Sequence, residues 1–413
     1  MNPHVRKVRS GIIFPLRLVL GTQNEKSPWG FNTKKEMKKI VFLFVISLML
    51  WSCNGKVEVS VFNNSEVDRV NETVELCLCE LKGFDAKKLI VLNAEGKQIP
   101  SQILYRGTDQ PQTLIFQVTL AAGKEEIFTL KEGNPESFAP KTFAHFVPQR
   151  KDDLSWENDR IAFRMYGPKL APENPSNGPD VWYKRTEALI TEKWYAEELS
   201  GKKSYHTDGG EGLDCYKVAH TLGAGGVCPY SNDSLWVGNQ FDRYQILDNG
   251  PIRSSFVLFY DAVKYQNKKL KAEFVVNLDA GSNLNEVRVR YTGDTTEMRL
   301  AVGIWLHDSI QSLNVNQDLS TIGYAENLMS EGKKPVPSGR GYTGVVFPSS
   351  WRESKRISGH IVGIVDYKIG EEFQYYFGAG WNKHGFATDK DWFTYLNNRK
   401  AALLQPLKIK ILK

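Results

Sequence analysis

The sequence of 413 residues has little cysteine and no long apolar run. Its five cysteines do not have the spacing of a zinc site. The longest apolar segment, 40–50, is too short for a helix that spans a bilayer, which needs about 20 residues. The sequence has no Gly-x-Ser-x-Gly elbow, which argues against an α/β-hydrolase. It also lacks a Walker motif and the dinucleotide glycine fingerprint, so Gly223-Ala224-Gly225-Gly226 is not read as a nucleotide loop.

The sequence also lacks a basic surface of the kind that nucleic acids select. The formal net charge is +6, but the first 53 residues hold nine Lys and Arg against two Asp and Glu. The rest of the chain therefore holds 44 basic and 45 acidic residues, and no basic stripe occurs in it. No nucleic-acid partner is expected.

The N-terminal segment has the pattern of an export signal. Met37-Lys38-Lys39 precedes the apolar run 40–50, and Leu50-Trp51-Ser52-Cys53 resembles a bacterial lipobox. We therefore expect translation to start at Met37 and residues 1–53 to be a leader. Cys53 is expected to be lipidated and to anchor an exported, periplasmic or outer-membrane protein to the membrane. The alternative is an uncleaved apolar anchor.

The other four cysteines suggest few disulfides. Cys77 and Cys79 are two apart on an expected strand, so they should point to the same face without bridging. Cys215 and Cys228 flank a glycine-rich turn and could pair, but buried free thiols explain them equally well.

The pattern after the leader predicts an all-β fold in two parts. Residues 54–131 contain short runs of period two separated by turns, which is typical of a β-sandwich. The segment 132–150 carries three prolines and is interpreted as a linker.

The second part, 151–413, contains at least ten expected strands, which favours a large antiparallel two-sheet sandwich. Its final strand is expected at 406–412. The best helix is expected at 183–199, and the proline-rich stretch 167–180 should be a long loop.

Segment 205–214 (YHTDGGEGLD) holds the leading catalytic candidates. His206 can take or return a proton, with Asp208 and Glu211 as partners, because imidazole and carboxylate serve both roles when burial tunes the pKa. Tyr205 could act as an acid or stack on a sugar, and Lys217 could neutralise a uronate carboxylate. A solvated Asp/Gly turn with a charged rim is the alternative.

The same segment could instead bind a metal. Asp208, Glu211 and Asp214 offer hard oxygen ligands suited to calcium, although their spacing differs from an EF-hand loop. Apart from this possible calcium ion, no cofactor is expected.

The C-terminal segment 381–392 is the second candidate. Trp381 could stack on a sugar ring, Lys383 could bind its hydroxyls or carboxylate, and His384 could be the acid/base group opposite His206. An exposed loop anchored by tryptophan explains the pattern equally well.

Two arginines could bind the substrate at a distance from both segments. The planar guanidinium groups of Arg243 and Arg253 suit a uronate carboxylate. Charges on strand surfaces, held in ion pairs, are the favoured alternative.

Five motifs carry a resemblance that covers about 57–413. They are WENDR (156–160), YHTDGGEG (205–212), TLGAGG (221–226), GPIR (250–253) and GAGW (378–381). The chain resembles a Bacteroidota lipoprotein family known only as a domain of unknown function, which accompanies pectin- and uronate-degrading enzymes. More broadly it resembles the galactose-mutarotase-like supersandwich superfamily. The resemblance implies a large sugar-binding sandwich and does not imply one reaction.

These observations lead to three hypotheses. The first is an enzyme acting on uronic-acid-containing, pectic oligosaccharides by acid/base chemistry, as a lyase, epimerase or hydrolase. The second is a glycan-binding lipoprotein without catalysis. The third is a structural subunit of a glycan-import complex that holds calcium.

Overall fold

The computed structural model describes residues 55–412 except 174, 177, 308–311 and 332–333. The leader and its expected lipidation site, Cys53, lie outside the described residues. None of the helices in the described part of the chain is long and apolar enough to cross a membrane.

Two small sheets form the first part of the structure. Alternating side chains of their strands meet in one apolar core, which includes Val59, Val74, Phe116 and Leu130. The first sheet has the order β25-β1-β6-β3 and the second β2-β5-β4. The strands are β1 (Lys56–Phe62), β2 (Arg69–Cys77), β3 (Leu89–Leu92), β4 (Ser101–Leu104), β5 (Thr113–Leu120), β6 (Glu125–Glu132) and β25 (Lys408–Leu412), with a 3₁₀ turn at Ala86–Lys88.

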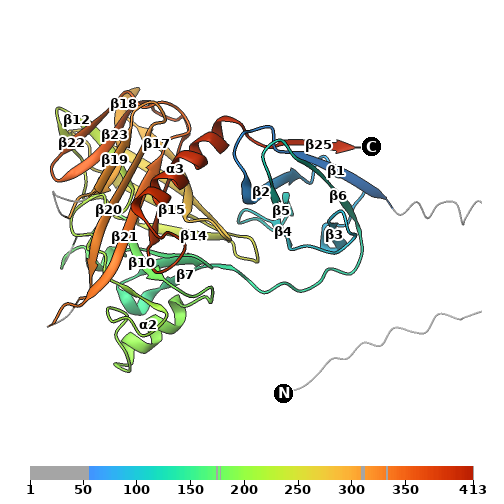
Figure 1. Ribbon diagram of the computed structural model, residues 1–413. Coiled ribbons are helices and arrows are strands. Elements are labelled where there is room, and N and C mark those ends of the chain that lie inside the picture. Colours follow the sequence, from blue (N-terminus) through green and yellow to red (C-terminus); the bar gives the residue numbers. More distant parts are fainter. Residues whose placement is uncertain (1–54, 174, 177, 308–311, 332–333, 413) are drawn as a thin grey trace, which may run out of the picture. The chain divides into compact units, whose positions relative to one another are not determined.

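The position of β25 differs from expectation. We expected the last strand to belong to the 151–413 sandwich, but β25 pairs antiparallel with β1, with Val59 opposite Ile411. Figure 1 shows this strand beside β1 at the C-terminal end of the chain. The first sheet is therefore built from both ends of the described chain.

Three further sheets build the large sandwich. Their orders are β11-β10-β9-β8-β7, β13-β12-β18-β23-β22 and β14-β15-β16-β17-β24-β21-β20-β19. Long strands such as β15–β17 pair along most of their length, with one bulge in the β15–β16 ladder. The strands are β7 (Thr142–Val147), β8 (Asp153–Asn158), β9 (Ala162–Met165), β10 (Asp180–Lys184), β11 (Gly212–Asp214), β12 (Gly226–Ser231), β13 (Ser234–Leu235), β14 (Arg243–Asp248), β15 (Arg253–Val263), β16 (Leu270–Asp279), β17 (Leu284–Gly293), β18 (Glu297–Trp305), β19 (Ser312–Asn316), β20 (Thr321–Met329), β21 (Pro337–Val346), β22 (Glu353–Ile357), β23 (His360–Lys368) and β24 (Phe373–Trp381), with 3₁₀ turns at Pro148–Arg150 and Pro168–Leu170.

The predicted all-β fold is confirmed, with differences at the helices. Helix α2 (Thr191–Leu199) is shorter than the expected 183–199, because Tyr183 and Lys184 lie in the buried strand β10. Helix α3 (Asp389–Leu404) was not among the predicted elements. It begins with a capping box between Thr388 and Asp391 and packs on β20 and β21 (Figure 1).

The expected linker is also shorter than 132–150. Strand β7 occupies part of it and pairs with β8 through contacts such as Ala144 opposite Trp156. The prolines at 135 and 140 lie between β6 and β7, where no ladder hydrogen bond is required of them.

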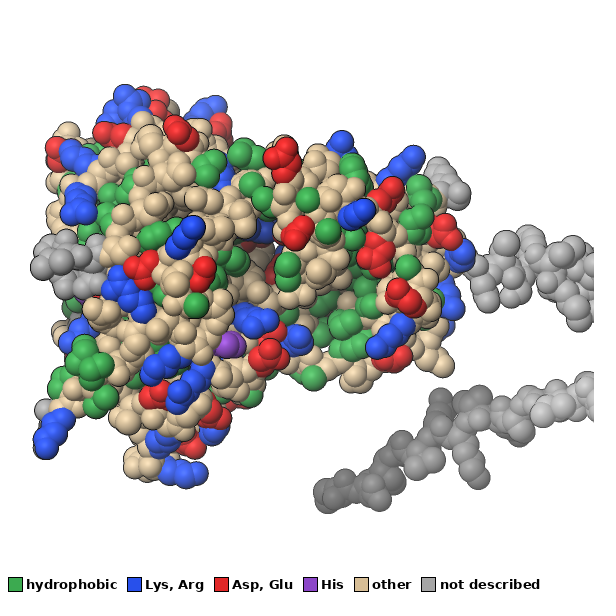
Figure 2. All heavy atoms as spheres, in the orientation of Figure 1, with side chains coloured by type: hydrophobic (Ala, Val, Ile, Leu, Met, Phe, Trp, Pro, Cys, Tyr) green, Lys and Arg blue, Asp and Glu red, His purple; other side chains and the backbone are tan. Residues whose placement is uncertain are grey.

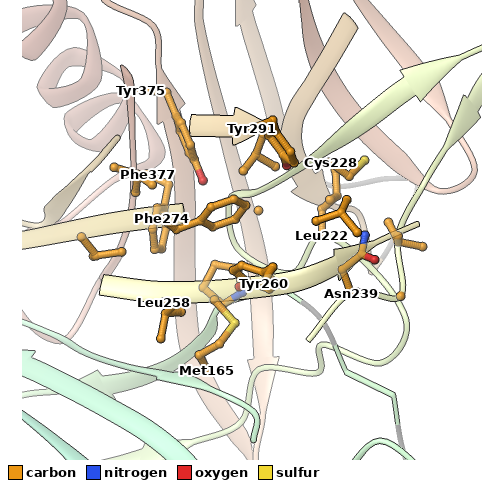
Figure 3. A pocket seen from close by; sticks show the side chains of 18 of the residues that line it. Met165, Leu222, Cys228, Asn239, Leu258, Tyr260, Phe274, Tyr291, Tyr375 and Phe377 are labelled. Atoms are coloured by element: carbon orange, nitrogen blue, oxygen red, sulfur yellow. The ribbon is translucent and has the colours of Figure 1, made fainter. Parts of the chain in front are cut away.

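A cavity of about 40 Å³ lies inside the large sandwich (Figure 3). Tyr260, Tyr291, Tyr375 and Phe274 line it, and none of its lining side chains is charged. Its volume suits a few water molecules, at roughly 10–15 Å³ for each. This cavity is therefore distinct from a polar site that could hold a sugar.

The cysteines correct one expectation. Cys77 and Cys79 form a disulfide, although we expected them not to bridge. The reason is that β2 ends at Cys77 and the chain turns directly afterwards, so the two side chains do not share one strand face. Cys215 and Cys228 are buried free thiols, as the alternative interpretation held.

Candidate active site

The loop between α2 and β11 places His206 at the surface of a buried polar cluster. Its side chain is 29% exposed, and its Nδ1 lies 3.1 Å from the carbonyl oxygen of Asp214. The same nitrogen is 3.5 Å from a carboxylate oxygen of Glu331 and 3.7 Å from one of Asp214. His206 therefore has two carboxylates within reach and access to solvent. We call these residues the His206 group.

Beneath the His206 group, four adjacent strands direct charged side chains toward one another. Arg164 on β9 donates two hydrogen bonds to Asp180 on β10, at 2.5 and 2.9 Å, and one to Asp214 on β11 at 2.9 Å. Asp153 on β8 lies 3.9 Å away. Tyr205 completes the packing, because its hydroxyl oxygen accepts from Arg164 at 3.3 Å. We call these five residues the Arg164 cluster.

The Arg164 cluster has more carboxylates than its central cation can neutralise. Burial raises the pKa of Asp153 to about 6, against the attraction of Arg164. Burial also raises the pKa of Asp180, and burial together with the charge of Asp180 raises that of Asp214 well above its usual range. One oxygen of Asp180 has no hydrogen-bond partner. The cluster therefore retains protons at a pH where ordinary carboxylates have lost them.

A second histidine–carboxylate pair lies beyond the same segment of chain. His307, which follows β18, places its Nδ1 2.8 Å from Glu326 on β20. Its Nε2 donates to the carbonyl oxygen of Lys217 at 2.6 Å, and its ring contacts Tyr216 edge-on. Burial would lower the pKa of His307, but the hydrogen bond and charge of Glu326 outweigh it and raise that pKa. We call His307 and Glu326 the His307 pair.

Strand β20 and the segment 205–217 connect the two histidines. Glu326 lies on β20, and Glu331 follows the end of that strand. Carboxylates of both groups act on Cys215, because burial and then the charges of Asp214, Glu326, Asp180 and Glu331 raise the pKa of its thiol. The carboxylates beside the two histidines therefore act on the same buried thiol.

Other residues of the predicted site form its rim. Asp208 accepts from Arg185 at 3.1 Å and lies 3.7 Å from Lys383, which brings the segments 205–214 and 381–384 together as expected. Glu211 instead binds Lys193 at 2.7 Å, and this hydrogen bond lowers the pKa of Glu211. Glu211 is therefore held ionised and away from His206.

The C-terminal candidates fit their expected roles poorly. Trp381 is 1% exposed and donates from its ring nitrogen to the carbonyl oxygen of Ser338, so its ring cannot stack on a sugar. The Lys383 ammonium lies 4.8 Å from the centre of that ring. His384 is partly exposed, and no side-chain hydrogen bond or ion pair joins it to His206 within the described part of the chain.

The two predicted arginines are held in ion pairs, as the alternative interpretation stated. Arg253 is buried and binds Asp279 and Glu75. Arg243 is exposed and binds Asp261 across two strands. Lys217 contributes its backbone carbonyl to His307, while its side chain is exposed.

The carboxylates proposed for calcium do not converge. Asp208, Glu211 and Asp214 each bind a different cationic side chain. Among the residues that the structure describes, no group of three or more His, Cys, Asp or Glu is placed to hold a metal ion.

Sequence reasoning missed most of the other members of the site. These are Asp153, Arg164, Asp180, His307, Glu326 and Glu331. A usable signal was present, since a charged residue inside an otherwise apolar strand must be paired or functional. Glu326 in β20 and Arg164 in β9 both meet this description.

The comparisons with known proteins agree with this fold. A family model described as Domain of unknown function (DUF4861) matches residues 61–409. A protein of Formosa agariphila described as uncharacterized protein P7 is 27% identical over 402 residues, which are 91% of this chain and 100% of that protein.

Two solved structures share the architecture. One is an α-mannosidase from Enterococcus faecalis V583, with a TM-score of 0.51 and 10% identity over 92% of this chain and 49% of that one. The other is a glycosyl hydrolase family 38 protein from Enterococcus faecalis, with a TM-score of 0.50 and 12% identity over 92% and 51% of the two chains. This chain spans about half the length of both, and the likeness concerns the fold.

Proposed function

The chain belongs to the family described as Domain of unknown function (DUF4861), and we propose that it is a carbohydrate-active enzyme whose site joins the His206 group to the His307 pair. The observation that carries the proposal is the pair of histidines, each beside a glutamate from β20 or the turn after it, with both glutamates close enough to the buried Cys215 to raise the pKa of its thiol. Such an arrangement offers a proton acceptor and a proton donor to one ligand.

The electrostatics suggest how the roles divide. His307 has a raised pKa, because Glu326 stabilises its charged form, and we assign it as the proton donor. The proton that passes to the ligand is the one on its Nε2, which the carbonyl oxygen of Lys217 accepts in the free protein. His206 is partly exposed and serves as the proton acceptor, with a carboxylate oxygen of Glu331 3.5 Å from its Nδ1. The protons held by the Arg164 cluster keep this region from accumulating excess negative charge.

The substrate class follows from the chemistry of proton abstraction. A sugar carbon gives up a proton most readily beside a carboxyl group, which a uronic acid carries. We therefore propose uronic-acid-containing oligosaccharides, including pectic fragments, as substrates of elimination or epimerisation. The exposed ammonium groups of Lys217, near His307, and Lys383, near Asp208, supply positive charge for the uronate.

Two lines of support come from the comparisons. The first is the fold, which this chain shares with a protein described as an α-mannosidase. The second is the extent of the family match, because residues 61–409 include both the His206 group and the His307 pair. Neither defines the sugar.

The test is proton NMR of pectic and other uronate oligosaccharides incubated with the protein. We expect new unsaturated-uronate or anomeric signals, and a loss of at least about a hundredfold in their rate of formation in His206→Ala and in His307→Ala, the range expected of an acid/base residue. Circular dichroism should show that both variants stay folded.

The matched control is His220→Ala. His220 is exposed and makes no side-chain hydrogen bond within the described residues, so its loss should leave the rate unchanged. Undiminished turnover in the His206 and His307 variants would refute the assignment. Broadened ligand signals without new products would instead favour the alternative, a glycan-binding protein without catalysis.

A further inference from the structure

The disulfide between Cys77 and Cys79 lies at the surface, at the end of β2. Both cysteines are exposed, and only Leu78 separates them. The disulfide belongs to the first part of the structure and shares no residue with the His206 group or the His307 pair. Its role is therefore independent of the proposed function.

This disulfide adds no connection between distant parts of the chain. The turn is already held by backbone hydrogen bonds from Leu78 to Gln112 and from Glu80 to Cys77, each 3.0 Å long. The β2–β5 ladder continues up to Cys77, which lies opposite Thr113. Because the stabilisation by a disulfide grows with the length of the loop that it closes, a three-residue ring contributes little. A purely structural role leaves its presence unexplained.

The local geometry favours one direction of bond cleavage. The backbone N–H of Cys79 donates to the sulfur of Cys77 at 3.3 Å. A thiolate on Cys77 would gain from this hydrogen bond, so Cys77 is the better leaving group and Cys79 the sulfur that an incoming thiolate attacks. The hydrogen-bonded turn keeps both sulfurs adjacent after reduction, which favours re-closure.

We propose that Cys77 and Cys79 form a reversible thiol–disulfide exchange site for small aliphatic thiols. A thiolate attacks the Cys79 sulfur, the bond to Cys77 breaks, and the electron pair leaves on Cys77, which takes a proton from water. A second thiolate attacks the outer sulfur of the mixed disulfide and releases a small-molecule disulfide and the Cys79 thiolate. Two electrons thereby pass from two thiols to the protein, and the reverse sequence re-forms the bond.

The other described cysteines are unsuited to this chemistry. Burial raises the pKa of the Cys228 thiol to about 12 and that of Cys215 beyond the usual range. Both therefore stay protonated and inaccessible, and exchange is confined to Cys77 and Cys79.

The test compares reduction of the folded and the unfolded protein. The full chain is purified without reductant, incubated with millimolar glutathione at neutral pH, and its free thiols are trapped by alkylation and counted by mass spectrometry. We expect both thiols to appear in the folded protein at a rate within about threefold of that in guanidinium chloride, since an exposed disulfide gains no protection from folding. Oxidised glutathione should restore the disulfide.

Two controls define the site. Cys215→Ser/Cys228→Ser should react like the native chain, and Cys77→Ser/Cys79→Ser should not react. In the single variants, the Cys77 thiol left by Cys79→Ser should be alkylated with a lower pH midpoint than the Cys79 thiol left by Cys77→Ser. Folded-state reduction slower by more than about a hundredfold, or the reverse order of pH midpoints, would overturn the proposal.

Discussion

Two buried charge clusters share one sheet, and they are built differently. Lys184 on β10 binds Glu157 on β8 at 2.6 Å and also the carbonyl oxygen of Asn158. Glu157 in turn accepts from the backbone nitrogens of Ile190 and Thr191 and from the Thr191 hydroxyl. One cation faces one anion, and each has further hydrogen bonds. This pair joins the start of α2 to the sheet.

The Arg164 cluster has the opposite balance. Arg164 faces three buried carboxylates, only Asp153 among them also feels the charge of Arg150, and one oxygen of Asp180 stays without a partner. A pair such as Lys184 and Glu157, in which each charge has its partners, is sufficient for stability. The excess of carboxylates in the Arg164 cluster is therefore better explained by function. The comparison teaches that the ratio of charges, and not burial alone, separates a structural pair from a functional one.

The largest expected effect comes from removing the centre of the Arg164 cluster. Arg164→Met should lower the free energy of unfolding by about 4 kcal/mol at neutral pH, because Asp180 and Asp214 lose the guanidinium to which they are hydrogen-bonded. The loss should shrink as the pH falls toward 5, since protonation neutralises the carboxylates that Arg164 no longer compensates. Urea unfolding at several pH values measures the loss in free energy of unfolding and its dependence on pH.

The control for this variant is Arg185→Met, which removes a partly exposed partner of Asp208. It should cost less than about 1 kcal/mol. A loss in Arg164→Met that did not change with pH would contradict the excess of buried carboxylates.

Removing Lys184, the cation of the pair with Glu157, should have a slightly smaller effect on stability. Lys184→Met should lower the free energy of unfolding by about 3 kcal/mol, because Glu157 keeps its three other donors. Lys193→Met, at the exposed pair with Glu211, is the matched control and should cost about 0.5 kcal/mol or less. Urea unfolding measures the losses in both lysine variants. Equal losses would contradict the expectation that the buried pair stabilises the protein more than the exposed pair.

The smallest effect is expected at Asp153. Its pKa is raised to about 6 in the folded state from an ordinary 3.8, so folding binds a proton, and stability falls as the pH rises through that window. Asp153→Asn should reduce this fall by about 2 kcal/mol, while its amide oxygen can still accept from Gly167. An unchanged pH profile of thermal unfolding would show that the carboxylate titrates normally.

Much of the fold could be predicted from local pattern. Apolar residues at every second position identified the strands, and their number indicated a large sandwich. The pairing of β25 with β1 could not be predicted, because it joins residues about 350 positions apart. Helix α3 could have been predicted, since Thr388 and Asp391 form a capping box and Trp392 and Leu396 have helical spacing.

The site was predictable only where it lies in a glycine-rich loop. His206 and Asp208 lie in a conspicuous motif, and the contact of Asp208 with Lys383 joins the two segments that composition suggested. His307 stands alone after a strand, and only the folded structure brings it to Glu326. Residues that come from distant parts of the chain and meet only in the folded structure have no fixed sequence spacing. A single sequence therefore does not reveal that they belong to one site.

The pairing of β25 with β1 has a consequence for the order of assembly during synthesis. Until residue 412 has left the ribosome, β1 is an open edge with unpaired backbone groups, although it belongs to the first part of the structure to emerge. The first sheet therefore reaches its full width only after the large sandwich has been synthesised. Translation pauses or C-terminal truncations would leave that edge free to recruit strands from other chains.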